Sequence, residues 1–224
     1  YSFKKNKRIY ISNYISFFKR GFIMLDLNNS SNEGFFITHL INKNLSHKIF
    51  NKPMLFSYGK NTIIFGMGCF WGVEKLFWGI DGVNMTAAGY SGGKTDLPDY
   101  QKVCSGSTGH NEVVLINFNP NIISLYDLFK IFWESHDPTQ GMRQGNDIGT
   151  QYRSGIYTFS DQDLDLANKS KLIYEKKLKK GKFSQITTEI KMSSKFYFAE
   201  DYHQQYLAKN PNGYCALKGT GIQM

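Results

Sequence analysis

The chain has 224 residues, with 27 Lys and Arg against 18 Asp and Glu, which gives a formal net charge of +9. This length suffices for one well-buried domain with an appendage. Three cysteines are an odd and small number, so they argue against a disulfide framework and for a reducing compartment, where cysteine serves chemistry or packing. No apolar run reaches the roughly 18 residues of a membrane span.

The positive charge is concentrated in the N-terminal arm. Residues 1–25 contain six Lys and Arg and no acidic residue, and without these six the balance is 21 against 18, or +3. An acid-free stretch with Lys, Arg, Ser and Tyr is typical of an organelle transit segment, although an unstructured tail of biased composition has the same features. We therefore interpret residues 1–50 as a basic, poorly structured extension. A cytoplasmic location is expected, or a mitochondrial or plastid one if the extension is a transit segment.

The first predicted elements follow a segment at 26–52 that is rich in Asn, Ser and Lys, which we interpret as a linker or loose arm. The β-branched and aromatic run at 62–66 predicts a buried strand. It passes through two glycines into a stretch with apolar residues at helical spacing, which predicts a helix at 70–80 that stops near Gly82. Cys69 therefore lies where a strand turns into the N-terminus of a helix.

The later elements alternate between strands and helices. Ser124 and Ser160 are the expected N-cap residues of two helices, and Gly181 ends the second. Strands are expected at 113–118, 154–159 and 186–190, and helices at 125–136, 161–180 and 199–210. The order β-α-β-α-β-α-β predicts one α+β domain over 51–224, with helices packed on a mixed or antiparallel sheet and a flexible C-terminal tail.

Two long segments contain few predicted elements. They are Gly-rich and cover residues 87–110 and 136–155. Loops of this length are uncommon in a compact domain unless they build a site. We therefore expect the chemistry of the protein to lie in these two segments.

The stretch GMGCFWGVEKLFW, residues 66–78, sets Cys69 between glycines and directly before Phe70 and Trp71. A free cysteine has a pKa of about 8.5, and a helix N-terminus favours its thiolate. The position thus predicts a nucleophilic thiol beside an apolar wall. The alternative is a structural cysteine in a tight turn, with both rings as ordinary core residues.

Six separated blocks of the sequence resemble the A-type peptide methionine sulfoxide reductases, in order and over residues 60–215. They are GCFWG, AAGYSGG, VCSGSTGHNE, HDPTQGMRQGNDIGTQYRS, EDYHQQYL and NPNGYC. The resemblance implies a thiol-dependent oxidoreductase that reduces methionine S-sulfoxide, free or in proteins, on a ferredoxin-like sandwich with long functional loops. It implies no metal and no organic cofactor, and nothing in the sequence indicates either.

The resemblance also implies a role for each matched residue. Cys69 is the nucleophile that attacks the sulfoxide sulfur, and Glu112 is the acid that must be kept protonated at neutral pH. Phe70 and Trp71 receive the methyl group. The remaining site residues are Tyr100 and Tyr152, which donate hydrogen bonds to the sulfoxide oxygen, and Asp147, which arranges the site near the nucleophile.

Attack by Cys69 leaves a sulfenic acid, which a second thiol condenses with. The resemblance assigns this role to Cys215, in a Gly-rich tail, and implies thioredoxin as the reductant of the resulting disulfide. Many relatives carry a second tail cysteine at the position of Gln223, so the disulfide relay is expected to be shorter here. Cys104 is interpreted as a buried small hydrophobe.

The histidines His110, His136 and His203 are interpreted as structural hydrogen-bonding residues, because no metal-ligand spacing accompanies them. Two other functions remain open. One is a cysteine hydrolase or transferase that uses Cys69 with a histidine. The other is a basic module that binds RNA or a membrane surface through residues 1–50, although the near-neutral remainder argues against specific nucleic-acid binding. The protein is expected to be a monomer.

Overall fold

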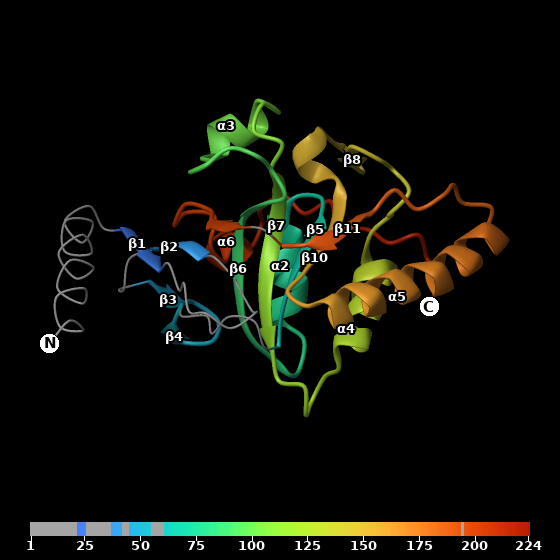
Figure 1. Cartoon of the computed structure of the whole chain (residues 1–224). Helices are drawn as coiled ribbons and strands as arrows, with labels where there is room; N and C mark the ends of the chain where they lie inside the picture. Colours follow the sequence, from blue (N-terminus) through green and yellow to red (C-terminus); the bar gives the residue numbers. More distant parts are fainter. Residues whose placement is uncertain (1–21, 26–36, 42–44, 55–60, 194) are drawn as a thin grey trace, which may run out of the picture.

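The structure is a computed structural model that describes residues 22–25, 37–41, 45–54, 61–193 and 195–224. Its main feature is a mixed sheet, eight-stranded in the described part of the chain, in the order β1-β2-β12-β6-β7-β5-β10-β11 (Figure 1). The strands in that order are Phe22–Leu25, Ile37–Ile41, Phe196–Phe198, Val83–Ser91, Asn111–Phe118, Thr62–Met67, Ser154–Thr158 and Glu189–Met192.

The centre of the sheet has ferredoxin-like topology. The segments β5, α2 (Phe70–Trp78), β6, β7, α4 (Leu125–Ser135) and β10 follow one another as β-α-β-β-α-β. The four central strands lie in the order β6-β7-β5-β10, and each neighbouring pair is antiparallel. The outer pair β10 and β11 is parallel and is connected by α5 (Asp161–Lys180). The predicted α+β class with helices packed on a mixed sheet is therefore confirmed.

The main core lies between one face of the sheet and helices α2, α4 and α5. Side chains alternate between the two faces of a strand, so Phe65 of β5 points into this core while its neighbour Ile64 points to the other face. The ring of Phe65 lies 5.4 Å from Phe77 of α2 and 4.9 Å from Phe132 of α4, measured between ring centroids. This packing fixes α2, and with it Cys69, on the sheet.

The helix caps follow the sequence signals. Ser124 and Asp127 form a reciprocal capping box at the start of α4, and Ser160 accepts a hydrogen bond from the Asp163 amide at the start of α5. Helix α5 ends at Lys180 with Gly181 as its C-cap, as predicted. Helix α2 ends at Trp78, two residues before the predicted end.

Several elements lie in segments that the sequence analysis left without structure. Strand β6 runs through the first Gly-rich segment to Ser91, and α3 (Tyr100–Cys104) follows within it. The Ala- and Gly-rich part of β6 has weak strand propensity, but Gly89 allows Phe196 of β12 to pack where a Cβ would clash. Strand β11 begins three residues later than predicted, at Glu189, and the last helix, α6, covers only Tyr206–Lys209.

The prediction that residues 26–52 form a linker is wrong for the last part of this segment. Strands β3 (Ser46–His47) and β4 (Lys52–Pro53) form a hairpin that packs on the second face of the sheet. The ring of His47 is fully buried, and Met54 is 4% exposed. The part of the predicted extension at 1–21, 26–36 and 42–44 lies outside the described residues.

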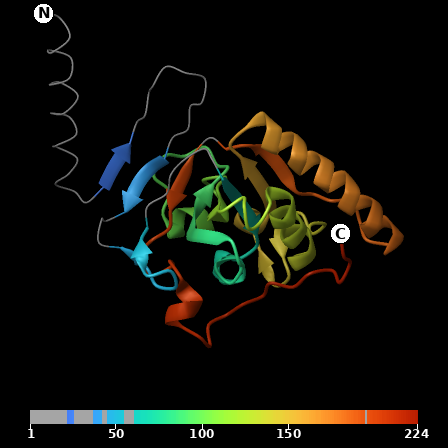
Figure 2. The ribbon, with the colours of Figure 1, turned by 90° about the horizontal axis from the view of Figure 1, so that it is seen from below.

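The C-terminal tail, expected to be flexible, is anchored along α4 and α5. The hydroxyl of Tyr174 in α5 lies 3.0 Å from Thr220 Oγ1 and donates to the carbonyl of Ile222. The amide of Met224 donates to Glu134 Oε1 of α4 at 2.6 Å. Figure 2 shows the tail running along the helix side of the sheet from α6 to the C-terminus. Within the described ranges, no helix combines the length and apolar character needed to cross a membrane.

Candidate active site

The turn between β5 and α2 places Cys69 as the N-cap residue of α2. Gly68 precedes it with a positive φ of 93°, where a Cβ would lie only 2.7 Å from Gln144. Gly72, in the first turn of the helix, has a second function. A Cβ on Gly72 would lie 2.9 Å from Cys215 Sγ. The missing side chain of Gly72 therefore allows the tail cysteine to pack against the helix that Cys69 caps.

The pKa of the Cys69 thiol is raised, contrary to the expected lowering. Burial is the largest cause, and the nearby Glu112 adds to it, while a hydrogen bond from the Trp71 amide favours the thiolate and offsets only part of the increase. Desolvation thus outweighs the helix N-terminus here. Cys69 is therefore a neutral thiol in the resting site.

Glu112 lies at the start of β7, opposite Tyr90 of β6, and is 1% exposed. Its Oε2 accepts a hydrogen bond from the Phe70 amide at 3.2 Å, which places the carboxyl group beside the residue that follows Cys69. Burial raises the pKa of Glu112 to about 8, with Asp147 and Glu200 contributing. A carboxylic acid with this pKa is mostly protonated at neutral pH and can donate a proton.

Aromatic rings form a wall beside Cys69. Phe70 is fully buried, whereas Trp71 is partly exposed. The indole of Trp71 stacks on Tyr206 of α6 at 3.8 Å with an interplanar angle of 13°, and its Nε1 donates to His203 Nδ1 at 3.0 Å. The ring of His203 also packs 4.9 Å from Phe70.

The structure thus adds His203 and Tyr206 to the residues predicted for this wall. Both lie in the matched block EDYHQQYL, so that block was the available signal. Burial lowers the pKa of His203 to about 4, and the ring is therefore neutral. It holds Trp71 in place, which is the structural role expected of it.

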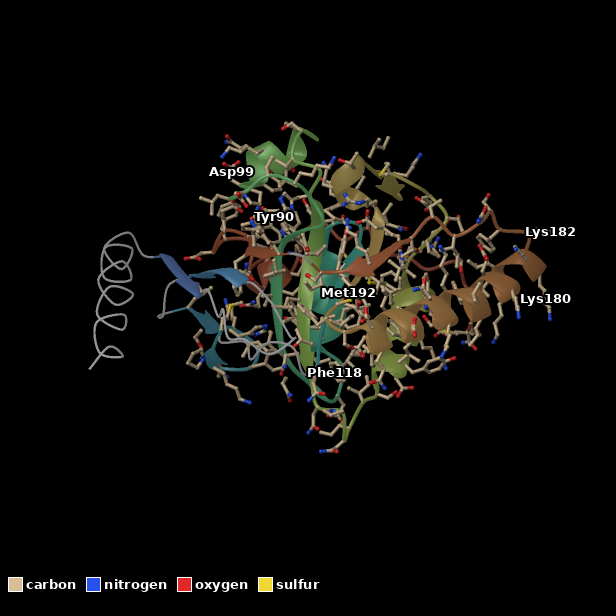
Figure 3. All side chains as sticks on the ribbon, viewed as in Figure 1. Tyr90, Asp99, Phe118, Lys180, Lys182 and Met192 are labelled. Atoms are coloured by element: carbon tan, nitrogen blue, oxygen red, sulfur yellow. The ribbon has the colours of Figure 1, made fainter. Side chains whose placement is uncertain are left out.

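Two phenols lie close to Glu112. Tyr100 begins α3 and donates its amide to Glu200 Oε1 at 2.8 Å, and Tyr152 ends the 3-10 helix Thr150–Tyr152. Burial is the main cause that raises the pKa of both phenols, and Glu112 contributes to each, so both stay protonated donors. Figure 3 places Tyr90 just below α3, beneath this edge of the site.

Asp147 lies in the short strand β9 (Asp147–Ile148), which pairs with β8 (Arg143–Gln144). Its Oδ1 accepts a hydrogen bond from the hydroxyl of Tyr214 at 3.1 Å, and burial raises its pKa. Its Oδ2 is buried and has no hydrogen-bond partner among the described residues. Tyr214, which the sequence analysis did not single out, precedes Cys215, so Asp147 also ties the tail to the site.

The three cysteines are all free thiols. The expectation that Cys104 is buried is wrong, because Cys104 is exposed at the end of the short helix α3. It lies one turn after Tyr100 and is hydrogen-bonded to that phenol. Cys104 is therefore closer to the site than the sequence indicated. The tail cysteine Cys215 is the one whose Sγ packs against Gly72 of α2.

Replacing Cys104 tests whether this proximity matters. In Cys104→Ser, turnover should stay within about twofold of the wild type, because a serine hydroxyl keeps a hydrogen-bonding partner for Tyr100. The measurement is steady-state turnover with a protein dithiol as reductant. Loss of the thiol-regenerating half-reaction in this variant would instead make Cys104 the resolving cysteine.

The other two histidines of the matched blocks, His110 and His136, have structural partners. His110 accepts from the Gly93 amide at 3.2 Å and its Nε2 lies 2.8 Å from the Thr95 carbonyl, which closes the loop before α3. His136 bridges the Phe132 carbonyl and Ser154 Oγ, both at 2.7 Å. Burial is the largest cause that lowers the pKa of each ring. These contacts agree with the predicted structural role.

One edge of the sheet thus brings together a neutral thiol, a protonated carboxyl group, two phenols and an aromatic wall, from segments far apart in the sequence. The thiol offers a nucleophile, the carboxyl a proton, and the phenols hydrogen bonds to a polar atom beside an apolar group. The fold and this arrangement define a thiol-dependent enzyme.

Comparison with known proteins shows which family of thiol-dependent enzymes the chain belongs to. The family model described as "Peptide methionine sulfoxide reductase" matches residues 61–222. A peptide methionine sulfoxide reductase of Rippkaea orientalis is 58% identical over 79% of this chain and 82% of its own length, and one of Vibrio vulnificus is 60% identical over 73% and 78%. The chain therefore belongs to the peptide methionine sulfoxide reductase family and is an oxidoreductase.

Solved structures agree with this assignment. Methionine sulfoxide reductase A of Corynebacterium diphtheriae matches with a TM-score of 0.72 and 44% identity, over 75% of this chain and 83% of that one. Mxr1 from Saccharomyces cerevisiae in its reduced form matches with a TM-score of 0.65 and 40% identity, over 69% and 88%. The predicted family and enzyme class are therefore confirmed.

Proposed function

We propose that the protein reduces methionine S-sulfoxide, free or in proteins, to methionine through Cys69. The observation that carries this proposal is the buried Glu112 carboxyl group, held at the N-terminus of α2 by the Phe70 amide and given a pKa of about 8 by its burial. A sulfoxide oxygen leaves only after it gains a proton, and Glu112 is placed and tuned to supply it. The test is dithiol-dependent reduction measured separately on the two sulfoxide epimers. Activity on the S epimer alone is expected, and no activity on either would refute the proposal.

The proposed chemistry follows from the neutral state of the Cys69 thiol and of the Glu112 carboxyl group. The phenols of Tyr100 and Tyr152 hydrogen-bond the sulfoxide oxygen and make the sulfur electrophilic. The Cys69 sulfur attacks it, Glu112 protonates the oxygen, and the thiol proton restores the acid form of Glu112. The attack forms a bond between the two sulfur atoms. That bond and the substrate S–O bond then break as the hydroxyl group is transferred to the Cys69 sulfur, so methionine leaves, Cys69 becomes a sulfenic acid and two electrons pass from the thiol to the substrate.

The apolar wall is complementary to one side of the proposed substrate. A methionine sulfoxide ends in a methyl group beside a polar S=O. The partly exposed indole of Trp71 and the buried ring of Phe70 offer an apolar contact to the methyl, while the donors on α3 and the 3-10 helix face the oxygen. Asp147, with one unpartnered oxygen in the described structure, orders the polar side through hydrogen bonds or water.

Cys215 is the proposed partner of the sulfenic acid. Its sulfur packs against Gly72, in the first turn of the helix that Cys69 caps, and its thiol is exposed. Condensation of the Cys69 sulfenic acid with the Cys215 thiol forms a disulfide and releases water. Because Gln223 stands where a further cysteine would continue the relay, this disulfide is itself the substrate of the reductant, which we propose is thioredoxin.

Removal of the resolving thiol should separate the two half-reactions. Cys215→Ser is expected to release one methionine per enzyme as a burst and then to stall with thioredoxin, because the sulfenic acid has no partner. A small thiol should restore turnover by attacking the sulfenic acid directly. Rapid-quench counting of methionine checks the burst, and peptide mapping of the oxidised wild type checks the bridge. A Cys69–Cys104 disulfide as the main product would overturn the assignment of Cys215.

A hydrolase that uses Cys69 with a histidine is less well supported. His203 is the histidine at the aromatic wall, and its Nδ1 accepts the hydrogen bond of Trp71.

We further propose that the protein acts as a monomer, and that it works in the cytoplasm or in an organelle. Nucleic-acid binding by residues 1–50 has no support from the described part of the chain.

A further inference from the structure

Glu74 is a buried carboxyl group that the proposed reaction does not use. It lies on α2 one turn after Trp71 and is fully buried. A buried carboxyl group is costly unless it is well hydrogen-bonded, and Glu74 accepts three hydrogen bonds. Two come from Gln205, from its amide at 2.7 Å and its side-chain Nε2 at 2.9 Å, and the third comes from Thr86 Oγ1 at 3.2 Å.

Gln205 has a left-handed backbone conformation, with φ 46° and ψ 44°. A residue with a Cβ is strained there, so its neighbours have to hold it. The residue lies between His203 and Tyr206, the two residues that contact Trp71. The turn at Gln205 thus brings both rings onto Trp71. Glu74 stabilises this turn because it accepts hydrogen bonds from both the backbone amide and the side chain of Gln205.

The same network extends to the hairpin of β3 and β4. Because Thr86 donates its hydroxyl proton to Glu74, the His47 Nε2 that lies 2.9 Å from Thr86 Oγ1 must be the donor in that pair. His47 Nδ1 then accepts from the amides of Ile49 and Phe50. The hairpin also contacts Gln205 directly, because the Lys48 amide donates a hydrogen bond to Gln205 Oε1 at 3.2 Å. Figure 2 shows the hairpin beside α6.

We propose that Glu74 and Gln205 form a positioning clamp for the aromatic wall, and that the hairpin Leu45–Met54 supports this clamp from behind. The proposal rests on the proposed function, because it takes the wall at Trp71 as the receptor of the substrate methyl group. The hairpin precedes residue 61, where the match to the family model begins. A segment outside the matched region therefore takes part in shaping the substrate site.

The clamp predicts an effect on substrate binding rather than on chemistry. It contacts the wall through α6 and makes no hydrogen bond to Cys69 or Glu112 in the described structure. A loosened wall should weaken binding of the methyl group, whereas the proton and the nucleophile stay in place. The Michaelis constant should therefore rise with little change in turnover number.

Two substitutions open the clamp. Glu74→Gln turns one acceptor oxygen into an NH₂ group that faces donors, and should raise KM for methionine sulfoxide about tenfold with kcat within about twofold. Thr86→Val removes only the hydroxyl that joins Glu74 to His47, at nearly constant volume, and should raise KM about threefold. Thr86→Ser keeps the hydroxyl and should retain the wild-type KM.

Ser170→Ala is the matched control for general loosening. Ser170 is also fully buried and accepts from Trp133 Nε1 at 2.9 Å, but it lies in α5, away from the wall. It should lower the melting temperature and leave KM unchanged. An unchanged KM in Glu74→Gln, or an equal rise in Ser170→Ala, would overturn the clamp. If Glu74→Gln fails to fold, the Thr86 pair decides in the same way. A wild type without reductase activity would refute the proposed function instead, so the two failures are distinguishable.

Discussion

Cys69→Ser is expected to lower turnover by at least about 10⁴-fold, because a serine hydroxyl is a far weaker nucleophile towards sulfur and cannot form a disulfide. The serine is nearly isosteric at a helix N-cap, so the fold should persist. The measurement is single-turnover reduction of methionine sulfoxide with purified protein. Near-UV circular dichroism and the melting temperature provide the control for folding.

The cysteine dependence needs a second control. Cys104→Ser removes a thiol on the same edge of the site and should remain active, so that loss in Cys69→Ser cannot be ascribed to any cysteine change. Substantial reductase activity in Cys69→Ser, with the fold intact, would exclude the mechanism through this thiol.

Glu112→Gln should slow the reductase step about 10²- to 10³-fold, the usual contribution of a general acid. Substrate binding should change little, because the amide keeps a hydrogen-bonding group beside the Phe70 amide. The pH profile gives an independent readout. With a pKa of about 8, Glu112 carries its proton below that pH and loses it as the pH rises above it. The wild-type single-turnover rate should therefore fall above pH 8.

In Glu112→Gln that fall should disappear, since the amide does not titrate. A chemical rate equal to that of the wild type would remove Glu112 from the role of acid. Persistence of the same pH profile in the variant would assign the titration to another group of the site.

The sequence predicted the elements that carry strong local signals. Ser124 and Ser160 marked helix starts because their side chains satisfy backbone amides within three residues. The β-branched and aromatic run at 62–66 marked β5, which is buried on both faces. Strand β6 gave no such signal. Its Gly89 is favoured there by the close approach of Phe196, a contact from more than 100 residues away that no local pattern reports.

The site was predicted in the same uneven way. Cys69, Glu112 and the phenols were found through motifs, and the structure places them together. The direction of the Cys69 pKa was predicted wrongly, because the sequence shows a helix N-terminus but not the burial that outweighs it. The exposure of Cys104 and the clamp at Glu74 were also missed, since both depend on how distant segments pack.

In the proposed cycle, the anchoring of the tail limits how long the Cys69 sulfenic acid persists between the two half-reactions. Cys215 lies between two fixed points, Tyr214 on Asp147 and Thr220 on Tyr174, only a few residues apart. The thiol therefore stays close to Gly72 instead of sampling a large volume. In the proposed reaction, the sulfenic acid on Cys69 would therefore meet Cys215 after a short excursion, which would leave little time for a second oxidant to convert it irreversibly to a sulfinic acid.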